Sequence, residues 1–95
     1  MNKKVIDSYL DRALSNPYHA VSFVEDCFVF HLYWMPIHNH IECTMRFNPE
    51  WGHTNSIYGR TKDEFIKCYE EKIKEEKKLY TNGGKFPKDY YKYCD

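Results

Sequence analysis

Apolar residues recur at helical spacing in the first segment of the chain, from Lys3 to Ser15. Charged and polar residues occupy the opposite side, which is the pattern of an amphipathic helix with one buried face. The helix is expected to end at Asn16-Pro17, because the residue before a proline is disfavoured in the α conformation. The stripe consists of Val5, Ile6, Tyr9, Leu10, Ala13 and Leu14.

A second helical pattern begins at Thr61. Thr61 and Glu64 have the spacing of a capping box, in which the hydroxyl and the carboxylate satisfy free backbone donors. The helix is expected to end at Asn82-Gly83-Gly84. After Ile73 the stripe gives way to charged residues, so we expect the last turns to project into solvent. The buried stripe comprises Phe65, Ile66, Tyr69, Ile73 and Tyr80.

Between the two helices the pattern changes to period two, with many β-branched and aromatic residues, which is typical of strands. We predict three strands, at about 19–24, 27–35 and 40–47. A turn at Glu25-Asp26 would separate the first two, although one long bent strand would also fit.

The second and third predicted strands can be aligned through their connection. A turn at His38-Asn39 and a loop from Ile37 to His40 give the same register, with Trp34 opposite Cys43. A slip of one residue would move every side chain to the other face, so this match of apolar positions supports the pairing. The predicted core face comprises Phe28, Phe30, Leu32, Trp34, Ile41, Cys43, Met45 and Phe47.

The other face of the predicted sheet mixes polar and large apolar residues, and the loop at 48–60 adds more. Tyrosine, tryptophan, methionine and arginine are the residue types that dominate protein interfaces. We therefore predict a partner-binding surface there. Its residues are His31, Tyr33, Met35, Arg46, Trp51 and Tyr58.

These elements predict a two-layer α+β domain over residues 1–84, with both helices on one face of a three-stranded antiparallel meander. Residues 85–95 form an irregular, tyrosine-rich tail. Ninety-five residues make one domain with a small core, which argues against a large catalytic site.

The charge is balanced, with 14 basic and 14 acidic side chains. Global electrostatics therefore favours neither nucleic acid nor a membrane as partner. No leader peptide or apolar run of about 18 residues is seen, so we expect a cytoplasmic protein. The four cysteines lack a C-x-x-C pair, which favours reduced thiols over a metal or redox site. Their even number leaves a secreted disulfide protein as an alternative, against which the missing signal peptide argues.

"MPIHNHIEC" places His38, His40 and Glu42 close together, a conceivable metal cluster. The string also spells the name of the His-Asn-His nucleases, but those residues are dispersed over a longer motif in that family. No second cluster completes a hydrolytic site, so we interpret the segment as a turn. We expect no enzyme activity, no cofactor and no bound metal, with metal binding through these three residues as a further alternative.

"YGRTKDEFIKCYEEK" is similar to the end of the three-stranded arm-binding domains of phage-type integrases. The order helix, three strands, helix also resembles double-stranded-RNA-binding domains. Both resemblances imply nucleic-acid binding as an alternative function, with Arg46, Arg60, Lys62 and Lys67 meeting phosphates.

The predicted order of helix, three strands and helix, together with the small size, also resembles small phage-encoded inhibitors of host defence, including anti-CRISPR proteins. This resemblance implies a protein partner and transfers no residues. Inhibitors that mimic nucleic acid are often strongly acidic, whereas this chain is neutral, which argues against a DNA-mimic mechanism. Our leading hypothesis is that the chain is a small protein-binding module. A narrower form of this hypothesis is that it inhibits a host-defence enzyme. Formation of a homodimer is left open.

Overall fold

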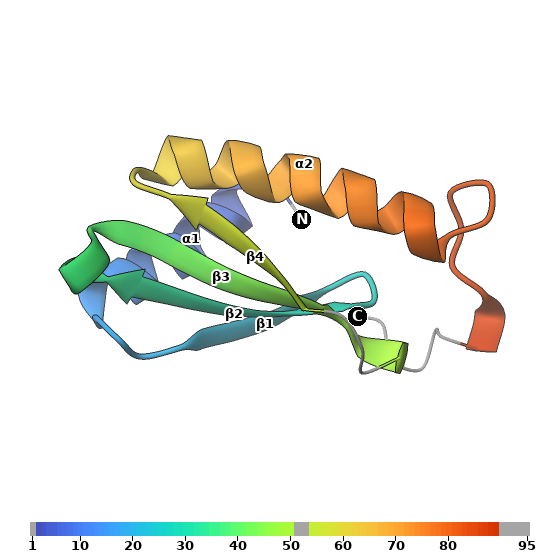
Figure 1. Cartoon of the computed structure of the whole chain (residues 1–95), viewed down its shortest axis with the longest axis horizontal. Helices are drawn as coiled ribbons and strands as arrows, with labels where there is room; N and C mark the ends of the chain where they lie inside the picture. The colour runs from blue at the N-terminus through green and yellow to red at the C-terminus, as the bar shows by residue number, and fades with distance from the viewer. Residues whose placement is uncertain (1, 51–53, 90–95) are drawn as a thin grey trace.

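The computed structural model describes residues 2–50 and 54–89. It contains an α-helix, a four-stranded antiparallel sheet and a second, longer α-helix, in that order along the chain (Figure 1). The α+β class is confirmed, but the expectation of three strands is wrong by one. The elements are α1 (Lys3–Ser15), β1 (Val21–Glu25), β2 (Phe28–Met35), β3 (His40–Phe47), β4 (Thr54–Gly59) and α2 (Lys62–Tyr80), with 3-10 turns at Pro36–His38 and Asn48–Glu50.

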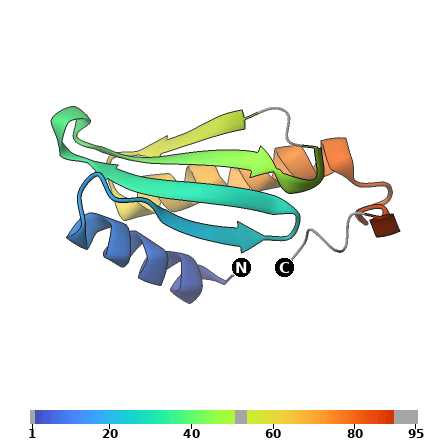
Figure 2. The same ribbon diagram turned by 90° about the horizontal axis from the view of Figure 1, so that it is seen from below.

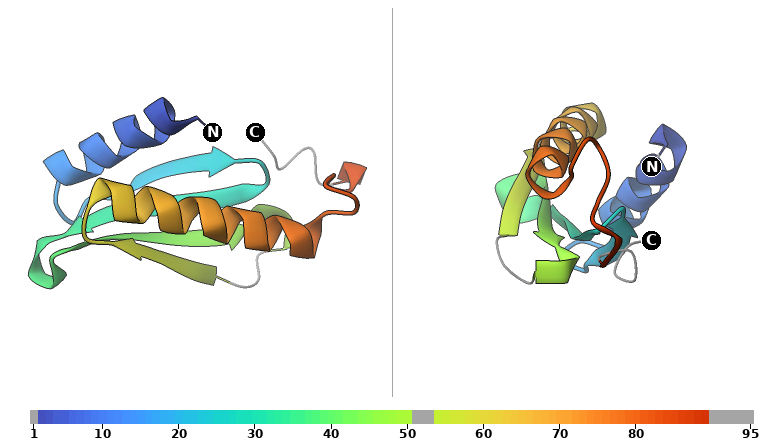
Figure 3. Two further views of the ribbon diagram at one scale, coloured as in Figure 1. Left: turned by 90° about the horizontal axis from the view of Figure 1, so that it is seen from above. Right: turned by 90° about the vertical axis from the view of Figure 1, so that its right-hand side faces the viewer.

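The strands pair in sequence order, and both helices lie on the same face of the sheet. Seen from above, α2 lies over the β3–β4 side of the sheet and runs roughly along the strands, while α1 lies toward the β1 side (Figure 3). The view from below shows the strands in front of α2, with no helix crossing them (Figure 2). The sheet therefore has one helix-covered face and one helix-free face. No helix of the described residues is long and apolar enough to cross a membrane.

A row of aromatic rings joins the two helices through the sheet. Phe23 of β1 stacks on Tyr9 of α1 with ring centroids 4.5 Å apart, and on Phe30 of β2 at 4.9 Å. The ring of Phe30 then meets Tyr69 of α2 at 5.3 Å. Because Phe23 and Phe30 are almost completely buried, these contacts exclude water from the middle of the core.

Strands β2 and β3 present the predicted faces, but their register differs from the predicted one by two residues. Trp34 lies opposite Ile41, not Cys43, and Met35 lies opposite His40. Pro36 to Asn39 form the connection, because proline starts the 3-10 turn and Asn39 adopts the left-handed conformation with a φ of 51°. A shift of two residues preserves the side-chain alternation, so seven of the eight predicted core residues are buried and Trp34 packs beside them.

The turn between β1 and β2 also differs by one position. Asp26 and Cys27 connect Glu25 to its partner Phe28, and Asp26 takes the left-handed conformation with a φ of 54°. Two strands with a tight turn are therefore present, and the alternative of one bent strand is wrong.

Strand β4 was expected to be part of a long loop. Its buried positions are Ile57 and Gly59, while Asn55 is half-buried and faces α2. Gly59 is required by packing, since a Cβ there would lie 2.4 Å from the backbone nitrogen of Phe65. A polar residue and a glycine at core-facing positions hide the alternation that identifies a strand.

Both helices begin and end close to where they were predicted. The side chain of Asn2 caps α1, and Thr61 Oγ accepts a hydrogen bond from the Glu64 N–H at 3.1 Å to cap α2. The end of α2 is less exposed than expected, because Glu76 is buried and accepts a hydrogen bond from Asn55. Pairing with an amide from β4 offsets part of the cost of burying this carboxylate.

The cysteines do not all match the expectation of free thiols. Cys43 is free and buried, and Cys68 is free and half-buried. Cys27 is completely buried and disulfide-bonded, so the expectation of a reduced thiol is wrong for this residue. Cys94 and most of the tail lie outside the described residues. Within the described part of the tail, Phe86 packs against Phe28 with ring centroids 6.0 Å apart.

Candidate functional site

The helix-free face of the sheet carries five of the six residues predicted to bind a partner. Strand alternation places His31, Tyr33 and Met35 of β2 on this face, and the register adds Arg46 of β3 and Tyr58 of β4. Tyr33 lies opposite Glu42, which in turn lies opposite Tyr58, so one row of side chains crosses three strands. The sixth residue, Trp51, lies outside the described residues.

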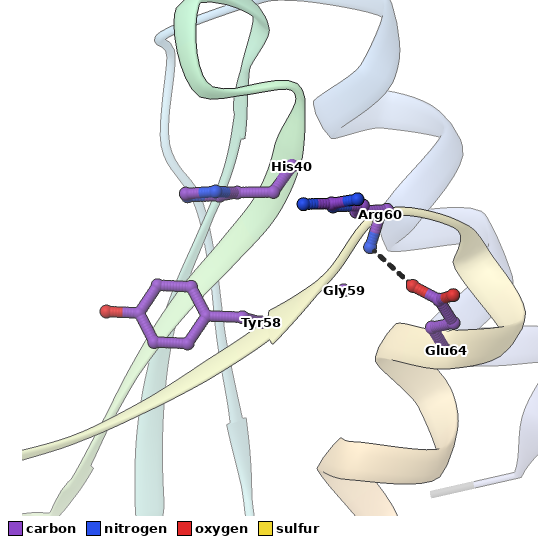
Figure 4. Close-up of a pocket in the computed structure, with 5 residues that line it drawn as sticks. All are labelled: His40, Tyr58, Gly59, Arg60 and Glu64. Atoms are coloured by element: carbon purple, nitrogen blue, oxygen red, sulfur yellow. Dashed lines mark hydrogen bonds between the residues drawn. The ribbon is translucent and has the colours of Figure 1, made fainter.

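One end of this face opens into a pocket of about 440 Å³ (Figure 4). His40 of β3 and Tyr58 of β4 form one side, and Arg60 and Glu64 form the other, with Gly59 between them. The pairing of Ile41 with Gly59 brings these segments together, although they are almost twenty residues apart in the sequence. Tyr58 is 49% exposed, which leaves a large apolar surface open to solvent.

The rings that line the pocket are held by their neighbours. The His40 ring stacks on that of His38 with centroids 5.4 Å apart, and meets the edge of Tyr58 at 5.2 Å. His40 Nε2 lies 3.3 Å from Glu42 Oε2. These contacts fix His40 from two sides, so the wall of the pocket is preformed.

The same histidines were the candidate metal ligands. His38 and His40 lie face to face as stacked rings, and the nitrogen of His40 that faces Glu42 makes a hydrogen bond with it. In the described part of the chain, no three His, Cys, Asp or Glu side chains are arranged to hold a metal ion. The structure therefore does not support the metal-binding alternative through His38, His40 and Glu42.

Arg60 and Glu64 are positioned by the start of α2. Glu64 Oε2 accepts a hydrogen bond from the backbone N–H of Arg60 at 3.0 Å, and its own N–H binds Thr61. The capping box is therefore shifted, since the carboxylate binds the residue before the cap. The guanidinium of Arg60 forms no ion pair within residues 2–50 and 54–89.

The connection between β2 and β3 projects beyond the pocket as an apolar tip. Ile37 is 76% exposed, and its backbone N–H donates a hydrogen bond to Tyr18 Oη at 3.2 Å. Tyr18 is itself exposed and has a φ of 66°, which is uncommon for a bulky residue. The Tyr18 N–H donates a hydrogen bond to the Trp34 carbonyl at 3.0 Å, so this conformation is held at both the backbone and the hydroxyl of Tyr18.

Two titratable groups with raised pKa values, Cys43 and Tyr69, lie in the core, away from this pocket. Burial raises the pKa of the Cys43 thiol far above its ordinary range. Burial, followed by a hydrogen bond to Glu25, raises the pKa of the Tyr69 phenol. A thiol that stays protonated is a poor nucleophile, so Cys43 acts as a core residue.

The four basic residues considered for phosphate binding are not gathered on one surface. Lys62 Nζ forms ion pairs with Asp7 at 3.0 Å and Asp11 at 2.8 Å, which raise its pKa and tie α2 to α1. Lys67 lies in a groove that it shares with Asp63 and Glu70. Arg46 and Arg60 remain on the sheet side.

Sequence reasoning missed the pocket because it missed β4. His40 was considered as a metal ligand, and Tyr58 and Arg60 as separate surface residues, but nothing in the sequence placed them side by side. The available signal was the pair Ile57-Tyr58, two residue types favoured in strands, after a turn-rich segment.

Comparison with protein-family models, with curated proteins and with solved structures gave no significant match.

Proposed function

We propose that this protein is a binding module that engages another protein through the helix-free face of its sheet and the pocket at its end. The observation that carries the proposal is the row Tyr33, Glu42 and Tyr58, which leads across three strands into the preformed pocket. Aromatic side chains with a polar tip contribute large contact area at low entropic cost, and they are enriched at binding hot spots.

Several features favour a protein over a small molecule as the partner. The pocket opens onto the helix-free sheet face and an exposed tip, which together suit the extended surface of a stable protein interface. The central groups are rigid: the His40 ring is held by two aromatic neighbours, and the tip is held by Tyr18. Preformed contacts lower the entropic cost of association.

Affinity capture from a bacterial lysate tests this proposal, with and without nuclease treatment. The tagged wild type is compared with a Tyr33→Ala, Tyr58→Ala double variant and with Leu79→Ala as a matched control. Leu79 is 72% exposed on α2, so its removal tests whether any exposed apolar residue has the same effect.

We expect one protein to be captured by the wild type and by Leu79→Ala, with or without nuclease, and to be lost in the double variant. Capture that disappears with nuclease would instead favour nucleic acid. Capture unchanged in the double variant would reject this face as the binding surface. The narrower hypotheses, a cytoplasmic location, the absence of enzyme activity and inhibition of a host-defence enzyme, remain predictions.

A further inference from the structure

The pocket at the end of the helix-free face has an electrostatic property that the proposed function alone does not require. Its lining contains one guanidinium, that of Arg60, and two carboxylates lie at or beside it, those of Glu42 and Glu64. Which of these groups lacks a partner determines the chemistry of the ligand.

Both carboxylates already accept hydrogen bonds. Glu42 Oε2 faces His40 Nε2 at 3.3 Å, and Glu64 Oε2 accepts the backbone N–H of Arg60 at 3.0 Å. Glu64 also lies in the first turn of a 19-residue helix, where the helix dipole favours a negative charge. Within the described residues, the guanidinium of Arg60 has no ion-pair partner, so it is the group left to bind a ligand.

We infer that this pocket receives a carboxylate carried by an acidic side chain of the partner protein, an inference that rests on the proposed function. A guanidinium presents paired N–H donors whose spacing matches the two oxygens of a carboxylate. Glu42 and Glu64 repel any anion in proportion to its charge, so a singly charged carboxylate meets less repulsion than a doubly charged phosphate.

The shape of the pocket agrees with an acidic side chain that arrives on a larger surface. Tyr58 and His40 form an aromatic wall opposite Arg60, and the exposed Ile37 stands on the adjoining tip. A single exposed ion pair contributes only about 0–1 kcal/mol, too little to hold a free carboxylic acid. The carboxylate therefore selects the partner, while the tip and the sheet face supply most of the affinity.

Selection from a phage-displayed library of random dodecapeptides on the immobilised full chain tests this inference. We expect the enriched peptides to share an aspartate or glutamate at one position. The best peptide is then synthesised with its acid and with the matching amide, and both are measured against the wild type, Arg60→Gln and Arg12→Gln. Arg12 provides a matched loss of charge on α1, where it lies over the Tyr9 ring.

Replacing the acid by the amide should weaken binding about fivefold to the wild type and to Arg12→Gln, a factor near the upper limit for an exposed ion pair. On Arg60→Gln the same change should matter less than twofold. An equal loss on all three proteins would overturn the inference, as would enrichment of basic peptides, which would assign the pocket to a cation bound by Glu42 and Glu64.

The two proposals fail in different ways. Peptides that bind without preference for an acid, but are weakened by Tyr33→Ala and Tyr58→Ala, would reject the carboxylate and leave the binding face in place. Peptides indifferent to both tyrosines would reject the face as well, and a selection that enriches no peptide would count against both.

Discussion

The two faces of the sheet are built by the same strands, yet their side chains are buried to different extents. On the helix-covered face, Phe30 and Leu32 have no exposed surface, and rings from both helices contact the strands. On the helix-free face, their immediate neighbours His31 and Tyr33 are only half-buried. We therefore expect a substitution on the helix-covered side of a strand to change stability, and one on the helix-free side to change the proposed binding.

This difference in burial also explains why accessible charged and aromatic side chains are found at the end of the helix-free face. The covered face is closed by packing, so its titratable groups, such as Tyr69 and Cys43, stay protonated and inactive. The free face ends where β3, β4 and the start of α2 meet, and there charged and aromatic side chains remain accessible.

The comparison would be broken most directly by Phe30→Ala. Removing a buried ring that contacts Phe23 and Tyr69 should lower the free energy of unfolding by about 3–5 kcal/mol. The neighbouring change His31→Ala should cost less than about 1 kcal/mol. Urea denaturation followed by circular dichroism measures both, and similar costs for the two variants would contradict the division into two faces.

Gly59→Ala tests the point where the covered face approaches α2 most closely. The added methyl would lie 2.4 Å from the Phe65 nitrogen, so backbone must move, and we expect a loss of about 2–3 kcal/mol in unfolding free energy. Ser56→Ala on the same strand is exposed and serves as the control, with an expected change within about 0.5 kcal/mol. A neutral Gly59→Ala would show that α2 can shift freely on the sheet.

Alkaline pH should destabilise the covered face. Burial raises the pKa of the Cys43 thiol in the folded protein, whereas the unfolded thiol titrates near about 8.5. Protonated thiol therefore favours the folded state, and this stability is lost as the pH rises above about 8.5, by about 2 kcal/mol at pH 10. Tyr69 acts in the same direction above about pH 10.

Urea denaturation at pH 8 and pH 10 measures this loss. Cys43→Ala removes the thiol and should reduce the difference between the two pH values by about 2 kcal/mol. An unchanged pH dependence in Cys43→Ala would assign the effect to other groups.

The smallest expected effect on stability is that of Thr61→Ala. Loss of the hydroxyl leaves the Glu64 N–H without its capping acceptor, at a cost of about 1 kcal/mol in unfolding free energy. Thr54→Ala, exposed on the helix-free face, should change stability by less than about 0.5 kcal/mol. A comparison of thermal midpoints is sufficient here, and equal midpoints would show that the cap does not contribute.

The helices were predictable because each presents an apolar stripe at a single period. The face of β2 and β3 was predictable for the same reason, and an error of two residues in register does not disturb it. Strand β4 was not predictable by this route, because Asn55 and Gly59 occupy positions that face the helices. Burial of Glu76 depends on that same asparagine, so missing the strand also meant missing its partner.

The candidate site depends on contacts between distant residues. His40 forms part of its wall, Arg60 supplies its guanidinium, and Ile37 lies on the neighbouring tip. Only the observed pairing of β3 with β4 brings His40 and Arg60 together. The sequence showed which residue types were exposed on one face, but the position where they converge depends on the fourth strand.

The two-residue ambiguity in register has a consequence for how the chain folds. Both alignments of β2 and β3 bury apolar residues against one another, so hydrophobic collapse alone does not distinguish them. The rejected alignment would place Pro36 inside the ladder, opposite Ile41, where a residue without an N–H is poorly tolerated in an interior strand. Pro36 therefore favours the native register over the alignment shifted by two residues.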